Sequence, residues 1–178
     1  MSEDKIVIAV SACLLGHKVR YDGEHRRHEW IANRLAQRVK LLPICPELDA
    51  GLSVPREPID LIGEIGNPRA IGRESETDLT DKLRQSASIR LQKKDIKHFS
   101  AFIFKDKSPS CAIRGEKIIL KSGRIVRKGT GIFAAELMRR YPQLPVIHAI
   151  DLDDDHKRES FMTHVLAYHR QQADSRNR

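Results

Sequence analysis

The sequence predicts an α/β fold: a single domain with a mainly parallel, Rossmann-like sheet flanked by helices, plus a C-terminal helix. Short apolar runs of strand length alternate with segments of helical periodicity, which is the pattern of βαβ units. The chain has 178 residues, an ordinary length for one domain. Apolar residues make up 40 % of the sequence and form no run long enough to span a membrane.

The first part of the chain contains three predicted strands and one predicted helix. Ile31, Leu35 and Val39 recur at helical spacing and mark the core face of that helix. Asp22 and Gly23 signal a turn before it. In order, we expect a strand over 5–12, a helix over 25–39, a strand over 40–45, an ordered loop over 46–58 and a short strand over 59–65.

The second part continues the alternation and ends in a helix. The segment 129–131 precedes a helical pattern, where it either forms a tight turn or offers backbone N–H groups to an anion. In order, we expect a capping box at 75–78, a helix with Leu79, Leu83, Ala87 and Leu91 on one face, a strand over 100–105, a loop over 106–115, a hairpin around 121–123, a helix from 131 to near 141, a strand over 145–150 and a final helix capped by 153–155.

The three cysteines all follow predicted strands. Cys13 comes after the first strand, Cys45 after the second, and Cys111 after the strand over 100–105. Ligands of open α/β sheets bind beyond the carboxyl ends of the strands, and neighbouring strands lie only about 4.8 Å apart. We therefore expect the three thiols to meet at one edge of the sheet and to form one site.

Three thiols at one edge allow several interpretations. Free cysteines often pack as small apolar residues in a core. A zinc ion would need a fourth ligand, for which His17 is the local candidate. A four-iron cluster needs only three cysteines if its fourth iron is left open to substrate. The spacing of the cysteines does not decide between these interpretations. Cluster-binding segments usually hold their cysteines close together, whereas these three are far apart in the sequence.

Polar side chains stand next to two of the cysteines. Glu47 follows Cys45 by two residues, and Ser108 and Ser110 precede Cys111. A carboxylate and a hydroxyl beside an open metal position could position water and move protons. The alternative for each residue taken singly is that Glu47 is an exposed loop acid and that the serines belong to an ordinary turn. For Arg56 the alternatives are a position facing the site and, as the default for an arginine, a position at the surface.

Four short motifs in order resemble the thiouracil desulfidase family, long known only as a domain of unknown function. They are Ser11–Gly16, Arg20–Gly23, Cys45–Glu47 and Ser108–Cys111, and the resemblance covers roughly residues 5–150.

The resemblance implies an oxygen-sensitive [4Fe-4S] cluster held by Cys13, Cys45 and Cys111. It implies that the thiocarbonyl sulfur of a thionated pyrimidine binds the unique iron, and that Glu47 and Ser108 assist catalysis. The implied reaction is non-redox: water replaces the sulfur, which leaves as sulfide.

Two features depart from the family pattern. Ala112 follows Cys111 where the family usually has glycine, which bears on the choice of substrate. Longer members carry a second domain, so the chain is either a natural short form or a truncated one. We expect a cluster-binding domain over residues 1–152, and a C-terminal helix with a basic tail over 153–178.

Charge and cysteine content bear on partners and location. The net charge of +8 admits RNA, but the basic residues are scattered and aromatic residues are few, so RNA is not favoured. We expect a small thionated substrate, no membrane partner and a cytoplasmic location, because the start lacks a signal peptide and the odd cysteine count favours reduced thiols. The alternatives are an enzyme that handles sulfur in thiolated nucleosides or tRNA, and a non-enzymatic zinc-binding or sulfur-carrier module. The oligomeric state does not follow from the sequence.

Overall fold

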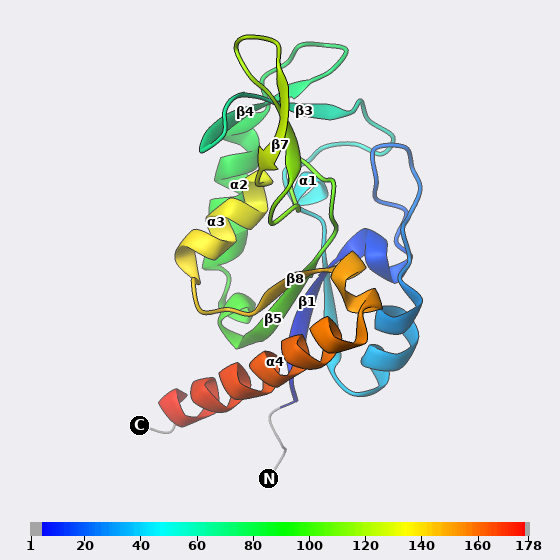
Figure 1. Cartoon of the computed structure of the whole chain (residues 1–178), viewed down its shortest axis with the longest axis vertical. Helices are drawn as coiled ribbons and strands as arrows, with labels where there is room; N and C mark the ends of the chain where they lie inside the picture. Colours follow the sequence, from blue (N-terminus) through cyan, green and yellow to red (C-terminus); the bar gives the residue numbers. More distant parts are fainter. Residues whose placement is uncertain (1–4, 177–178) are drawn as a thin grey trace.

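The computed structural model describes residues 5–176 and is built around a parallel four-stranded sheet (Figure 1). Its strands are β1 (Val7–Ser11), β2 (Lys40–Ile44), β5 (Phe99–Phe104) and β8 (Val146–His148), in the order β2-β1-β5-β8. All three strand pairs are parallel. The chain leaves β1 on one side to form β2 and returns on the other to form β5, so the strand order reverses between β1 and β5. This is the place where open α/β sheets bind their ligands.

A second four-stranded sheet lies beyond the carboxyl edge of the first (Figure 1). It contains β3 (Ile59–Glu64), β4 (Asn67–Gly72), β6 (Glu116–Ile119) and β7 (Ile125–Gly129), in the order β4-β3-β6-β7. Two antiparallel hairpins, β3–β4 and β6–β7, join through a parallel pairing of β3 with β6. The hairpin predicted around 121–123 is therefore confirmed, whereas β4 is a strand that the sequence pattern does not predict.

Helices cover both faces of the parallel sheet (Figure 1). Residues of α2 (Thr80–Gln92) and α3 (Ile132–Arg140) pack with Phe102 and Phe104 on one face, while α4 (Asp155–Arg176) packs with Ile8 and Ile103 on the other. Side chains alternate between the faces along each strand, so β1 and β5 contribute to both cores. The predicted flanked sheet and C-terminal helix are thus confirmed.

The helix predicted over 25–39 is wrong in its first part. Residues 30–34 form one short π-helical turn and 35–37 a 3₁₀ turn, but residues 24–28 are irregular. The N–H groups of Arg26 and His28 are bound to the carbonyls of Cys13 and Leu14, each at 2.9 Å. These bonds hold the segment against the turn after β1, and helical turns begin only at Trp30.

Three smaller boundaries also differ from the predictions. The loop after β2 contains a short helix, α1 (Pro46–Asp49). The capping box at 75–78 is wrong: α2 begins at Thr80, and Asp78 Oδ1 accepts the N–H of that residue at 3.0 Å. The last strand ends at His148 and is followed by a 3₁₀ helix, Ala149–Asp153.

In the part of the chain described, no helix combines the length and apolarity needed to cross a bilayer.

Candidate active site

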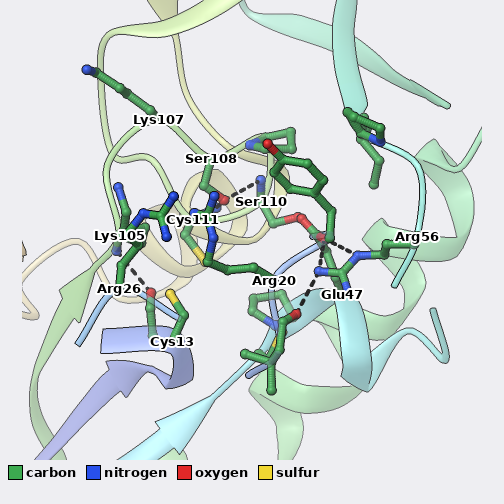
Figure 2. A pocket seen from close by; sticks show the side chains of 18 of the residues that line it. Cys13, Arg20, Arg26, Glu47, Arg56, Lys105, Lys107, Ser108, Ser110 and Cys111 are labelled. Atoms are coloured by element: carbon green, nitrogen blue, oxygen red, sulfur yellow. Dashed lines mark hydrogen bonds and ion pairs between the residues drawn. The ribbon is translucent and has the colours of Figure 1, made fainter. Parts of the chain in front are cut away.

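A cavity of about 500 Å³ lies at the carboxyl edge of the parallel sheet (Figure 2). One wall comes from the ends of β1, β2 and β5 and the loops that follow them. The opposite wall comes from the starts of β3 and β6 in the second sheet. The cavity therefore opens where the strand order reverses.

All three cysteines line this cavity. Cys13 lies in the 3₁₀ turn that follows β1, Cys45 lies between β2 and α1, and Cys111 lies in the loop after β5. None of them forms a disulfide. The structure thus brings the three predicted ligands together around one cavity, although they are far apart in the sequence.

Burial keeps these thiols protonated in the chain alone. Removal from water raises the pKa of Cys13 to about 11, although the nearby cations of Lys105 and Arg20 lower it. Burial also raises the pKa of Cys45, and that of Cys111 rises furthest, against a hydrogen bond with the Ser11 side chain. A bound metal would remove this cost, because coordination stabilises the thiolate.

Glu47 is a buried carboxylate at the start of α1 (Figure 2). Its Oε2 accepts a hydrogen bond of 2.7 Å from Arg56 Nε and forms an ion pair with Arg56 Nη2 at 2.5 Å, and its Oε1 accepts a hydrogen bond from the Ser110 hydroxyl at 2.9 Å. The alternative in which Glu47 is an exposed loop acid is therefore wrong. So is the surface position of Arg56, whose side chain is only 9 % exposed and also binds the Val19 carbonyl at 3.0 Å. A buried ion pair with these extra hydrogen bonds holds the carboxylate in a fixed orientation.

Ser108 closes the turn that presents Cys111. Its Oγ accepts the N–H of Cys111 at 3.0 Å and that of Ser110 at 3.3 Å. Its carbonyl accepts the N–H of Ala112 at 3.1 Å. Because a hydroxyl also carries one donor proton, Ser108 retains an O–H group to offer to the cavity that it lines.

The N-terminus of α3 holds the same loop from behind. Its first N–H groups bind the carbonyls of Pro109, Ser110 and Ala112 at 2.7–3.1 Å. The N–H groups proposed for an anion are thus bound to carbonyls, and segment 129–131 runs from the end of β7 into α3 with Gly131 in an extended conformation, not in a tight turn. Gly131 is required there, because a Cβ at this position would lie 2.4 Å from the Ser110 carbonyl carbon. The Ala112 side chain is fully buried and, among the residues described, is not part of the cavity wall.

The histidine candidate for a zinc site lies elsewhere. His17 is exposed and is not among the described residues that line the cavity. Within residues 5–176, no group of three or more His, Cys, Asp or Glu residues is placed to hold a single metal ion. The three thiols line one cavity.

Comparison with known proteins identifies the family. The family model described as 2-thiouracil desulfurase matches residues 8–149. The chain belongs to the 2-thiouracil desulfurase family. The predicted resemblance is thereby confirmed, and with it the prediction of an enzyme that acts on carbon–sulfur bonds. This result favours the enzyme over the non-enzymatic zinc-binding or sulfur-carrier alternative.

Two relatives extend this result. The desulfurase chain is 36 % identical over 139 residues to YbbK of Bacillus subtilis (strain 168), described as an uncharacterized protein, across 74 % of this chain and 89 % of the relative. A solved structure described as the [4Fe-4S]-dependent thiouracil desulfidase TudS matches with a TM-score of 0.65 and 32 % identity, across 84 % of this chain and 94 % of the other. The shared fold confirms the predicted α/β class.

The second wall of the cavity is charged, and its charged residues are not among those predicted from the sequence. Asp60 is buried, accepts two hydrogen bonds of 2.9 Å from Arg73 and lies 2.8 Å from Lys117 Nζ. These cations lower the pKa of Asp60 to about 2, against the effect of burial. Burial raises the pKa of Glu116, the first residue of β6. The β3–β4 hairpin brings Arg73 beside Asp60, and the pairing of β3 with β6 adds Glu116 and Lys117. No local sequence pattern signals the β3–β6 pairing.

Proposed function

We propose that this desulfurase removes the sulfur of a thionated, thiouracil-like pyrimidine with a [4Fe-4S] cluster held by Cys13, Cys45 and Cys111. The observation that carries the proposal is the arrangement of these thiols, which come from three strand ends and line one cavity with Glu47 and Ser108. The [4Fe-4S] dependence of the structural relative TudS supports the same cofactor. The overall reaction converts a thiocarbonyl and water to a carbonyl and hydrogen sulfide, with no net electron transfer.

The donor set suits such a cluster. Soft thiolates are the usual ligands of iron–sulfur clusters, and three of them leave one iron without a protein ligand. The cavity of about 500 Å³ has room for a ligand beside the thiols. When bound, the cluster supplies an open iron that acts as a Lewis acid towards a soft sulfur atom.

Glu47 is proposed as the group that takes a proton from the attacking water. A general base must lie within hydrogen-bond reach of the water and must be held in place. Arg56 fixes one oxygen of this carboxylate, and the Ser110 hydroxyl orients the other. The arrangement sets Glu47 beside Cys45 in the cavity wall, with its negative charge balanced by a partner that cannot lose its proton.

Ser108 is proposed to bind the substrate or relay a proton. Its oxygen already accepts two backbone N–H groups, so its own O–H is the group available to a bound ligand. Ser108 therefore has two tasks, since it shapes the cysteine loop and presents a donor to the cavity. The cations of Lys105 and Arg20 would offset the negative charge that accumulates on the ligating thiolates.

A thiolated nucleoside or tRNA remains the alternative substrate. Arg20, Arg26 and Lys107 line the same cavity and would attract phosphate groups. Binding of thiolated tRNA that weakens steeply with salt would favour this alternative, because phosphate contacts release counterions. Salt-independent turnover of free thiouracil would favour the small substrate.

The division of the chain into a cluster-binding domain over residues 1–152 and a C-terminal helix with a basic tail over 153–178 stays a prediction.

The test is desulfuration by protein that has been purified and reconstituted without oxygen. We expect about four irons per chain, broad visible absorbance, and conversion of thiouracil to uracil with release of sulfide. In water enriched in oxygen-18, the new carbonyl oxygen should carry the label. Stoichiometric zinc with no uptake of iron would contradict the cluster. Unlabelled product would contradict the role of water.

A further inference from the structure

His148 connects the edge strand β8 to the loop that carries Cys111. It is the last residue of β8 and is buried, with 4 % of its surface exposed. Its Nε2 accepts the backbone N–H of Ile113 at 2.8 Å. An imidazole nitrogen accepts a hydrogen bond only when it carries no proton, so the geometry assigns the tautomer with the proton on Nδ1.

The contacts along the cysteine loop show what this bond adds. Ser108 accepts N–H groups on the cavity side of Cys111, and α3 binds the carbonyls of the loop from behind. The N–H of Ile113, two residues after Cys111, instead meets a side chain from another strand. Next to it, Arg114 binds Asp151 at 2.6 Å. The end of the loop is thus attached to β8 and to the 3₁₀ helix that follows it.

Charged groups surround His148 on several elements. Burial lowers its pKa, and the cations of Arg114 and Lys105 act in the same direction. The carboxylates of Asp106 and Asp151 oppose this effect without reversing it. Near neutral pH the ring is therefore uncharged and able to accept the Ile113 N–H.

We propose that His148 is a positioning residue that, by accepting the Ile113 N–H, holds Cys111 in the place from which it ligates iron. The proposal rests on the function proposed above. The direction of the pH dependence of this attachment follows from the structure. A protonated Nε2 of His148 would carry an N–H group that faces the N–H of Ile113, so the hydrogen bond would be lost. The attachment is present above the ordinary histidine pKa of 6.5 and weakens as the pH falls below it, since the opened loop binds a proton more readily than the closed one.

Two variants separate the hydrogen bond from simple packing. His148→Leu fills the space but removes the acceptor, whereas His148→Gln supplies an uncharged acceptor oxygen that does not titrate. His164→Leu, at an exposed position of α4, serves as the matched control. The readouts are amide hydrogen exchange at Ile113 and alkylation of Cys111 in the cluster-free chain, and the rate of iron loss from reconstituted protein at pH 7.5 and 5.5.

We expect His148→Leu to speed Ile113 exchange, Cys111 alkylation and iron loss by about tenfold, the scale of one lost buried hydrogen bond. His148→Gln should restore most of the loss at pH 7.5 and should lack the extra iron loss of the wild type at pH 5.5. The control should match the wild type throughout.

Several results would overturn the proposal. They are unchanged Ile113 exchange in His148→Leu, faster exchange with unchanged alkylation and iron retention, and a His148→Gln variant as defective as His148→Leu. A wild-type chain that takes up no iron would contradict the proposed function. In that case Cys111 alkylation in the cluster-free chain alone decides the role of His148.

Discussion

The Ser110 hydroxyl donates a hydrogen bond of 2.9 Å to Oε1 of Glu47, and this bond joins two cysteine-bearing segments. Glu47 lies two residues after Cys45, and Ser110 lies directly before Cys111. The position of the carboxylate is therefore tied to the positions of two thiols. The effects of substitutions at these residues should therefore not be additive, because contacting residues do not act independently.

Replacing Glu47 should separate turnover from cluster binding. Glu47→Gln keeps an acceptor for Ser110 but cannot take a proton, so turnover should fall by roughly 10²–10⁴ while iron content survives. The measurement is sulfide release per cluster, with exposed Glu64→Gln as the control. Turnover near that of the wild type would remove Glu47 from the mechanism. Loss of iron would instead assign Glu47 to the structure of the site.

The two serines should give different phenotypes. Ser108→Ala leaves the N–H groups of Ser110 and Cys111 without an acceptor, so it should lower the free energy of unfolding by about 1–3 kcal/mol and also reduce turnover. Ser108→Thr keeps the hydroxyl and should recover most of both losses. Ser110→Ala should leave the turn intact and act mainly on turnover, through Glu47. Urea denaturation and sulfide release on the three variants give the comparison, and equal behaviour of the two alanine variants would contradict it.

The three cysteines should act as one unit in holding iron. Changing any one of Cys13, Cys45 or Cys111 to Ala should abolish stable cluster binding, and a second change should add little. Iron content and visible absorbance after anaerobic reconstitution provide the test. A single variant that keeps a full cluster would show that its cysteine is structural.

The buried thiols predict a dependence of stability on pH in the cluster-free chain. The folded-state pKa of Cys13 is about 11 and its ordinary value is 9.0, so the unfolded chain loses this proton first. Stability should therefore be retained below pH 9 and fall as the pH rises from 9 towards 11. Urea midpoints across this range measure the effect. Cys13→Ser, whose hydroxyl does not titrate there, should lose less stability, and an equal slope in both proteins would contradict the assignment.

Gly131 offers a test of the contact between α3 and the cysteine loop. Gly131→Ala would force a Cβ to within 2.4 Å of the Ser110 carbonyl carbon. The loop must shift, at a cost of about 1–3 kcal/mol, and iron should be lost faster. Gly66→Ala is the matched control, because its Cβ would meet nothing within 4 Å. Equal melting temperatures for the two variants would show that the α3 contact does not constrain the loop.

The parallel sheet and the gathering of the thiols followed from local patterns. The apolar runs before Cys13 and Cys45 are strand-like, and the ends of parallel strands share an edge, so three distant cysteines could be placed together in advance. The same reasoning places Glu47 and Ser108 beside the thiols, because each lies within three residues of a cysteine. These predictions need only the spacing of the apolar residues and the order of the strands and helices along the chain.

Other features depend on pairings that no local pattern encodes. The edge strand β4 begins with Asn67 and Pro68 and ends in Gly72, residues that are poor strand formers in isolation. The burial of Arg56 depends on Glu47, nine residues earlier, turning towards it. His148 accepts the Ile113 N–H only because β8 lies beside β5. Tertiary contacts therefore decide these roles.

The two walls of the cavity belong to different sheets, and this division has an evolutionary consequence. The thiols and Glu47 follow strands of the parallel sheet, whereas Asp60 and Lys117 stand on hairpin strands of the second sheet. Mutations in the hairpins can reshape one wall of the cavity while the cysteine-bearing edge of the parallel sheet is inherited unchanged. One ancestral set of cysteines can in this way give rise to family members that accept different sulfur compounds.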